Sequence, residues 1–384
     1  MDETFIYSKY VTGRNFIGRQ NEVHAFANLL AQGENVVIYE PPKSGKMSLV
    51  RQAFFNMQAA GTNFRAPAVS LLDIRTLRDL ALRIASETLR CFCNTPEEFA
   101  DASQALLRDC RISFDADSYY SGGSMLTADG ELGDEDLTAA ITLPYRAAAR
   151  IGSRIYVLLT EFQNVMLTED GDRFCRLMQD CFMRLDHVYR NAAAYIFTGS
   201  AVNAMHDIFG RRKLFFRQAE RIQLREIETR DIIDHINRSL LTSGKVIDRD
   251  LLLGTCKLFR NNIWYINHFA AICDSLSKGY IMENTLTAAL ESLISVHEPR
   301  FIATMNDLTT FQVNMLKAIL CGRTKFTSTE VIEEFGLSSS ANVRRLKDAL
   351  AKKEIVDFEN QAAPRVIDPL FEYWVRTRYF GMKI

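Results

Sequence analysis

Gly45 and Lys46 have the residue types and the order that phosphate binding requires. They follow an apolar segment, residues 35–39, and precede a stretch with the apolar spacing of an amphipathic helix. In loops of this kind, main-chain N–H groups and the start of the helix hold phosphates, and the lysine reaches the outer ones. A Ser or Thr after the lysine binds Mg²⁺. The stretch therefore predicts a phosphate-binding loop between a strand and a helix.

The loop departs from the full pattern, GxxxxGK followed by Ser or Thr, at two positions. Glu40 stands where the first glycine belongs, and Met47 where the hydroxyl residue belongs. Gly-Lys pairs also occur in ordinary surface turns, but the flanking strand and helix and a second apolar strand at 155–159 are the surroundings of a P-loop. We expect a P-loop fold whose nucleotide contacts are Pro42, Lys43, Ser44, Gly45, Lys46, Met47 and Ser48.

The second apolar strand, residues 155–159, ends in Thr160 and Glu161. In a working site this strand ends in Asp-Glu, where the aspartate steadies Mg²⁺ through water and the glutamate orients the attacking water. The metal carboxylate is therefore missing, whereas Glu161 is retained. The sequence leaves open whether Mg²⁺ is bound, and it predicts slow or absent hydrolysis.

Length and composition limit the other classes of function. At 384 residues the chain exceeds what one core usually supports, so two or three domains are expected. The formal net charge of −1 gives no global attraction to nucleic acid or to an anionic membrane. No apolar run approaches the ~20 residues of a membrane span, and the first residues lack a signal sequence. We expect a cytoplasmic protein without a membrane partner.

Other residues that resemble metal ligands do not fit a metal site. The eight cysteines include no CxxC pair, and Cys91 and Cys93 are too close together for zinc spacing, so reduced core thiols are expected. Asp115 and Asp117 open like a calcium loop, but Tyr120 replaces the required glycine. No metal ligands are therefore assigned.

Residues 94–138 depart from the pattern of a compact core. They hold eleven acidic residues against Arg108 and Arg111, and the centre is rich in Ser and Gly. This composition predicts an insertion or a mobile surface loop. Its role is either solvation or that of a flap that binds a partner or regulates the protein.

A segment upstream of the loop has the pattern FxGRxxE, with Phe16, Gly18, Arg19 and Glu22. It resembles AAA+ proteins of the STAND class, in particular a bacterial member of the archaeal-type ATPase family with degenerate Walker motifs. The resemblance implies that Phe16, Ile17 and Gly18 line the adenine pocket. Arg19 and Glu22 would be helix-end charges or simply solvated.

The resemblance extends through the rest of the predicted sheet. Phe162 and Gln163 after Glu161 match the family's DEFQ, and the strand at 193–198 resembles sensor 1, with Ser200 facing the γ-phosphate. Arg211 or Arg212 would reach the nucleotide or form a solvated basic turn. The candidate catalytic residues are Glu161, Ser200 and Arg211. Strands are also expected at 66–72 and 222–224, with Asp73 as a helix cap in preference to a nucleotide contact.

The remaining residues resemble the helical lid of AAA+ proteins and a winged helix. Residues 259–266 resemble the family's GGxPxYI turn, which would place Tyr265 over the base, although Trp264 and Tyr265 are also candidate core anchors. Winged-helix helices are expected at 310–320, 328–335 and 339–352, followed by strands at 355–358 and 365–367. The last of these helices carries Arg344 and Arg345, as a DNA-recognition helix would, but the net charge from residue 305 onward is only about +2. Residues 367–376 resemble a signature near DPxFxxWxR that closes the winged helix onto the core.

These features together predict an α/β P-loop core, AAA+-like, over residues 1–226, an all-α lid over 227–303 and a winged helix over 304–384. The resemblance implies an ATP/ADP-binding switch whose nucleotide state sets the lid and winged-helix positions, with an unidentified protein partner. Two alternatives stay open. One is a pseudo-ATPase scaffold that binds nothing or only ADP, and the other is a DNA-binding regulator that acts through Arg344 and Arg345.

Overall fold

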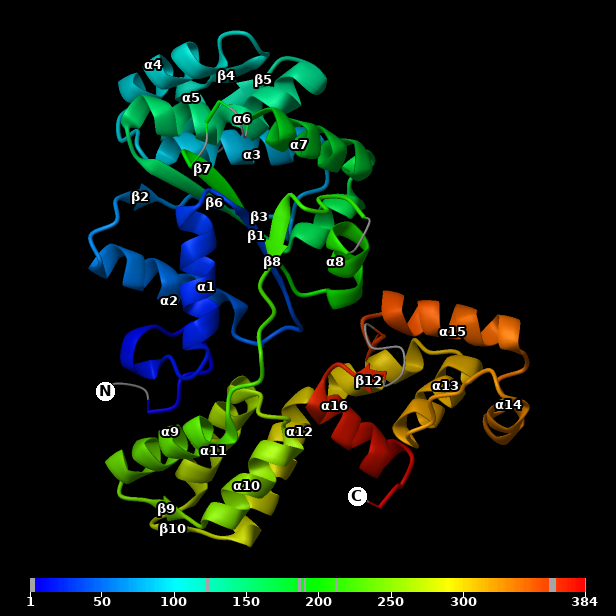
Figure 1. Ribbon diagram of the computed structural model, residues 1–384. Coiled ribbons are helices and arrows are strands. Elements are labelled where there is room, and N and C mark those ends of the chain that lie inside the picture. The colour runs from blue at the N-terminus through cyan, green and yellow to red at the C-terminus, as the bar shows by residue number, and fades with distance from the viewer. Residues whose placement is uncertain are drawn as a thin grey trace. The chain divides into compact units, whose positions relative to one another are not determined.

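A parallel sheet lies at the centre of one part of the chain. The computed structural model describes residues 4–121, 125–185, 188–189, 191–210, 213–358 and 364–383. The strand order is β2-β6-β7-β1-β8, β3 also pairs with β6, and these pairings are parallel. The strands are β1 (Asn35–Tyr39), β2 (Phe64–Arg65), β3 (Ala68–Ser70), β6 (Arg154–Thr160), β7 (Ala193–Gly199) and β8 (Ala219–Arg221) (Figure 1). The sheet confirms the predicted α/β class.

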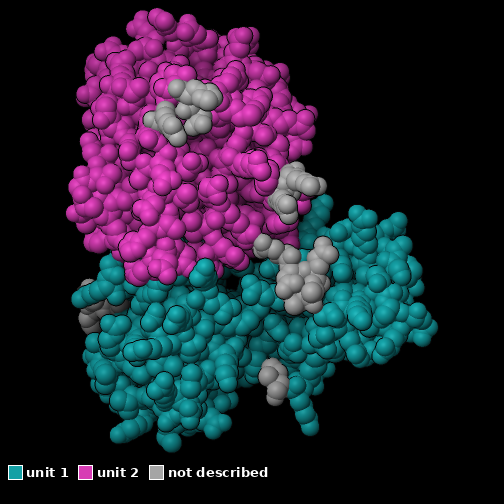
Figure 2. Space-filling view, in the orientation of Figure 1, with its two compact units in different colours: residues 1–19, 41–51, 225–384 teal, residues 20–40, 52–224 magenta. Residues whose placement is uncertain are grey.

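The described chain forms two compact units, each with its own apolar core. Unit 1 contains residues 1–19, 41–51 and 225–384, and unit 2 contains residues 20–40 and 52–224 (Figure 2). The strands of the parallel sheet belong to unit 2, whereas the predicted phosphate-binding loop groups with unit 1.

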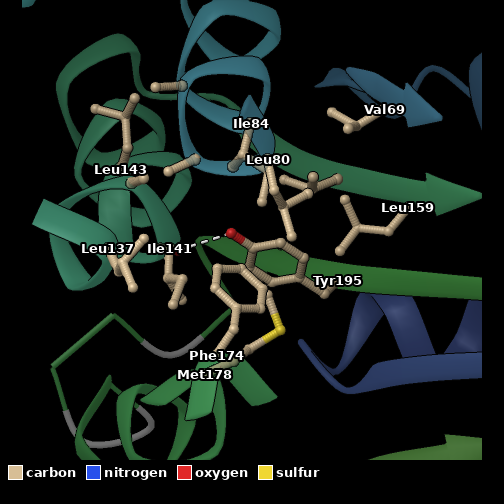
Figure 3. Close-up of a cluster of buried hydrophobic side chains, with 14 of the residues drawn as sticks. Val69, Leu80, Ile84, Leu137, Ile141, Leu143, Leu159, Phe174, Met178 and Tyr195 are labelled. Atoms are coloured by element: carbon tan, nitrogen blue, oxygen red, sulfur yellow. Dashed lines mark hydrogen bonds between the residues drawn. The ribbon is translucent and has the colours of Figure 1, made fainter. Parts of the chain in front are cut away.

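Helices cover the sheet of unit 2 because its inner strands are apolar on both sides. Tyr195 of β7 lies among side chains of the neighbouring helices, and its hydroxyl donates to the Ile141 carbonyl at 2.7 Å (Figure 3). The rings of Phe26, Phe54 and Tyr156 pack together, which joins two further helices to β6. The helices are α1 (Gln20–Ala31), α2 (Lys46–Ala59), α3 (Leu77–Arg90), α6 (Asp134–Ile151), α7 (Gly171–Leu185) and α8 (Val202–Phe209).

Residues 94–138 contain regular elements, so the expectation of a surface loop is wrong. Helix α4 (Pro96–Leu107) starts at the Thr95 cap, and β4 (Ile112–Phe114) pairs antiparallel with β5 (Leu126–Ala128), next to α5 (Ala116–Ser121). Phe99, Leu107 and Ile112 are buried in the unit-2 core. The elements of this region lie next to α3 and α6 (Figure 1). Apolar residues at helical spacing outweigh the acidic composition. Residues 122–124 lie outside the described residues, and the expected insertion stays a prediction.

Several predicted boundaries shift at the edges of the sheet. The second strand is shorter than residues 66–72, and β8 precedes the predicted residues 222–224, although the Ile222 N–H still donates to the Val37 carbonyl. Asp73 does not cap a helix, because Thr76 caps α3 and Asp73 pairs with Arg83 at 2.6 Å. Helix α7 ends at residue 185, and residues 186, 187 and 190 lie outside the description.

The lid region of unit 1 is helical, with one short pair of strands that the sequence did not predict. Its helices pack through a shared apolar core. They are α9 (Thr229–Thr242), α10 (Arg249–Leu258), α11 (Ile263–Leu276) and α12 (Glu283–Asn306), and β9 (Val246–Ile247) pairs with β10 (Tyr280–Ile281). Because α12 continues past residue 303, the predicted boundary between lid and winged helix falls inside a helix.

The winged-helix elements follow the prediction closely. They are α13 (Thr310–Leu320), α14 (Thr329–Phe335), α15 (Ser340–Lys352), and the antiparallel strands β11 (Val356–Asp357) and β12 (Arg365–Val366). Side-chain caps fix the helix starts, as with Ser328 and Ser339. The closing segment begins with α16 (Pro369–Trp374), capped by Asp368, and the Trp374 indole donates to Glu298 of α12 at 2.7 Å. Helices α12 and α16 therefore join this domain to the lid.

Candidate functional site

The carboxyl ends of β1, β6 and β7 lie at one edge of the sheet. Tyr39 pairs with Gly199, and Leu159 pairs with Phe197. Glu161 and Ser200 follow two of these strands, and Glu40 follows the third. This edge is where open parallel sheets bind ligands.

The loop between β1 and α2 has the backbone of a phosphate cradle. Lys43 (φ 64°) and Gly45 (φ 93°) are in the left-handed region. Pro41 and Pro42 carry no N–H, so main-chain donors begin at Lys43 and continue into the first turn of α2, whose N–H groups have no partner within the helix. The Ser44 hydroxyl oxygen is buried and has no hydrogen-bond partner among the described residues. These features fit the phosphate end of a nucleotide.

Lys46 starts α2 and points back into the loop. Its side chain is 8% exposed, and its ammonium donates to the Pro41 carbonyl at 2.9 Å. A buried ammonium needs partners of this kind, and a phosphate oxygen would be a stronger one. Phosphate binding by Lys46 stays a prediction.

Arg19 holds the loop in place, which the sequence did not predict. Its guanidinium donates to the carbonyls of Ser44, at 2.5 Å, and Arg225, at 2.9 Å. A Cβ at Gly45 would lie 3.0 Å from the guanidinium, so the glycine permits this close approach. Arg19 is thus neither only a helix-end charge nor solvated, whereas Glu22 lies in the first turn of α1 as expected. The one sequence signal for this contact of Arg19 was its place in the pattern FxGRxxE, just before the loop.

The predicted adenine-pocket residues lie beside the start of the lid. Ile17 packs against the unit-1 core, and Gly18 (φ 63°) approaches Ile227 so closely that a Cβ would lie 3.0 Å from it. Phe16 is half-buried, and its N–H donates to the Gly13 carbonyl. A contact of these three residues with a base stays a prediction.

Glu161 is held by its neighbours in unit 2. The hydroxyl of Ser200 donates to its carboxylate at 2.5 Å, and the Gln163 amide donates to the same oxygen at 2.7 Å. Glu161 has a φ of 54°, a left-handed conformation that costs about 1 kcal/mol or more and is common at functional sites. The structure brings two of the three candidate catalytic residues together. The third, Arg211, and Arg212 lie outside the described residues.

The residues at the magnesium positions do not fit that metal. Met47 offers a thioether, and the next hydroxyl, that of Ser48, accepts the N–H of Val11 at 3.2 Å. Thr160 has no carboxylate at the end of β6. Mg²⁺ prefers oxygen ligands in octahedral geometry, including carboxylates. The loop therefore fits a phosphate better than it fits the metal.

Glu40 forms a hydrogen bond with the main chain next to β8. One of its carboxylate oxygens accepts the N–H of Leu224 at 3.1 Å. Glu40 has no left-handed backbone to maintain, which explains why a glycine is dispensable there. This hydrogen bond directs the Glu40 carboxylate toward the main chain of Leu224.

A polar and aromatic cluster in unit 1 connects the loop to the lid and the winged helix. The Lys43 ammonium lies 3.4 Å from the centroid of the Trp264 ring, and the indole donates to the Tyr7 carbonyl at 2.6 Å. Beside it, the Tyr265 hydroxyl donates to Asp368 at 2.8 Å, and Arg300 pairs with the same carboxylate at 2.8 Å. Cation–π contacts are worth about 0.5–2 kcal/mol, depending on exposure.

Burial changes the acidity of several groups in this cluster. Burial, together with the nearby Arg300, lowers the pKa of Lys43 to about 8, although Asp368 opposes the shift. Burial and the positive charges of Lys43 and Arg300 lower the pKa of His297 to about 4. The pKa of the Tyr265 hydroxyl rises because the ring is buried next to Asp368.

Tyr265 occupies the position of a core anchor. It is 3% exposed, and its ring stacks on Phe259. Arg260 (φ 49°) and Asn261 (φ 54°) keep a left-handed backbone where the resembling family has glycines. Both residues thus adopt a backbone conformation that favours glycine, and base contact by Tyr265 stays a prediction.

Comparisons with known proteins support the fold. A family model described as "Probable winged helix domain" matches residues 299–377. The Walker-type ATPase PABY2304 of Pyrococcus abyssi is similar over 97% of this chain and 100% of its own, with 13% identity and a TM-score of 0.64. The ORC2 protein of Aeropyrum pernix, in ADPNP-ADP complexes, is similar over 93% of both chains, with 13% identity and a TM-score of 0.57. No curated protein matches the sequence.

The chain thus has an AAA+-like P-loop NTPase fold: a parallel-sheet core followed by a helical lid and a C-terminal winged helix. Within the part of the chain that the structure describes, no helix combines the length and apolar content needed to cross a bilayer.

The position of Lys43 over Trp264 predicts a pH-dependent fluorescence signal. Deprotonation removes the charge from the ring, so tryptophan emission should change with a midpoint near pH 8. Since the pKa of Lys43 lies below its usual 10.5, the unfolded chain holds this proton more tightly, and stability should rise with pH between these values. Lys43→Gln should abolish the transition near pH 8. A flat native titration, or the same midpoint in the variant, would contradict the contact.

Proposed function

We propose that this protein is an adenine-nucleotide-binding switch of the AAA+/STAND type with slow or absent ATP hydrolysis. The observation that carries the proposal is the loop itself. Its left-handed residues, the buried Lys46 and the unpartnered Ser44 hydroxyl form a phosphate-binding arrangement that Arg19 holds in place. The similar ORC2 structure contains ADPNP and ADP, which supports adenine as the base.

The contacts inside unit 1 give the loop a route to the rest of that unit. Lys43 of the loop lies on Trp264 of α11, and the adjacent Tyr265 donates to Asp368, the cap of α16. Arg260, at the turn before α11, donates to the carbonyl of Val366 in β12. A phosphate that displaces Lys43 would therefore act on side chains that also hold the winged helix. This favours a switch over a scaffold that binds no nucleotide.

A DNA-binding regulator is the second candidate. Arg344 and Arg345 are exposed on α15, as direct or phosphate contacts would require. The near-balanced charge of the domain and the hydrogen bonds of Asp368 and Trp374 to the lid favour docking instead. Tight, salt-dependent DNA binding that is lost in Arg344→Ala/Arg345→Ala would favour this candidate.

Lys46→Ala should weaken ADP binding by roughly tenfold or more, because hydrogen bonds to charged groups contribute about 1.5–3 kcal/mol. Isothermal titration calorimetry of the full chain measures this directly. Lys278→Ala, which removes an exposed lysine of the lid, is the matched control and should bind as the native chain does. Equal affinities for native and Lys46→Ala, or no heat in either, would refute nucleotide binding through the loop.

Steady-state ATP turnover in Mg²⁺ should lie far below ~1 s⁻¹, the lower end of the usual range for enzymes. Met47 and Thr160 remove oxygen groups that hold the metal, and phosphoryl transfer depends on neutralising the charge that spreads over the γ-phosphate. Glu161 is retained, so a water could still be oriented. Turnover near 1 s⁻¹ that Glu161→Gln abolishes would mean that the site is active despite both substitutions.

A further inference from the structure

We propose that the Lys43 ammonium replaces Mg²⁺ as the counter-charge for the nucleotide phosphates, so that nucleotide binds without the metal and Lys43 leaves the Trp264 ring. The inference rests on the proposed nucleotide binding and concerns what neutralises the phosphates. It follows because the residues at the positions that usually hold Mg²⁺ in this fold do not fit that metal.

The groups that would hold Mg²⁺ are absent or already engaged. Met47 has no oxygen, and Ser48, one residue further along α2, is turned to the main chain of Val11. Thr160 ends β6 without a carboxylate, and one carboxylate oxygen of Glu161 accepts two hydrogen bonds within unit 2. An adenine nucleotide carries several negative charges, which need a partner other than the metal.

Lys43 is a cation inside the loop that can meet this need. Its N–H is the first main-chain donor after the two prolines, so its Cα lies within the phosphate-binding segment itself. Its side chain extends to Trp264, where the ammonium lies on the ring face. The carboxylate of Asp368, which acts on this ammonium, is paired with Arg300. Rotation about its side-chain bonds is enough to bring it back toward the loop.

A phosphate is the stronger partner for this ammonium. Charge-assisted hydrogen bonds are about twice as strong as neutral ones, and a multiply charged phosphate attracts more strongly than the quadrupole of an aromatic ring. Burial and the neighbouring Arg300 already disfavour the charge of Lys43 over Trp264. The cation–π contact is therefore a resting position, and its loss reports that phosphate has bound.

Calorimetry of ADP binding to the full chain in excess EDTA and in excess Mg²⁺ tests the proposal. Native protein should bind with affinities within about threefold of each other in the two solutions. In EDTA, Lys43→Gln should bind at least tenfold more weakly, Lys43→Arg should retain most of the affinity, and the control Lys278→Gln should match the native chain. Tryptophan emission should change on ADP addition in EDTA for the native chain but not for Lys43→Gln.

The outcomes separate this proposal from the one on which it rests. Binding that needs Mg²⁺, or native affinity of Lys43→Gln in EDTA, would overturn the role of Lys43 and leave nucleotide binding intact. An absence of binding in both solutions would refute nucleotide binding itself. Circular dichroism of each variant identifies any loss of folding. If Lys43→Gln does not fold, the tryptophan emission of Lys43→Arg on ADP addition in EDTA is compared with that of native protein. A change like that of native protein supports the role of Lys43, and no change in either protein overturns it.

Discussion

The hydrogen bonds of Arg19 to the carbonyls of Ser44 and Arg225 are the interaction on which the rest of the candidate site depends. The loop contains a lysine in a left-handed conformation, which costs about 1 kcal/mol or more without compensation. Arg19 fixes the loop from the side, Gly45 leaves room for the guanidinium, and the second hydrogen bond ties the same group to the segment that leads into the lid. The positions of Lys43 and Lys46 follow from this fixed backbone.

Residues that depart from the P-loop motif and from the lid turn form hydrogen bonds with nearby main-chain groups. Glu40 accepts a main-chain N–H beside β8, Ser48 accepts one from the N-terminal segment, and Arg260 uses its left-handed backbone and its guanidinium to hold the carbonyl of Val366. The backbone of the loop thus fits a phosphate, whereas Met47 and Thr160 lack the groups that usually hold the metal.

Local sequence patterns predicted much of the fold because each depends on the residues of one short segment. The apolar runs of β6 and β7 are properties of short segments, and they placed these strands to within a few residues. The error over residues 94–138 arose from weighing acidic composition above apolar spacing. Asp73 was misjudged because it pairs with Arg83, which lies further along α3, while Thr76 caps that helix. Spacing likewise cannot show that Arg19 reaches Ser44, or that Lys43 reaches Trp264, since these pairs form only after long segments fold together.

The nucleotide content of the purified full chain tests the central claim, nucleotide binding through the loop, most directly. Native protein purified without added nucleotide is denatured with acid, and the released small molecules are separated by chromatography and compared with those from Lys46→Ala prepared in parallel. The account predicts ADP or ATP with the native chain and little or none with the variant. A native chain that carries no adenine nucleotide, and that retains none after incubation with saturating ADP and gel filtration, would contradict it.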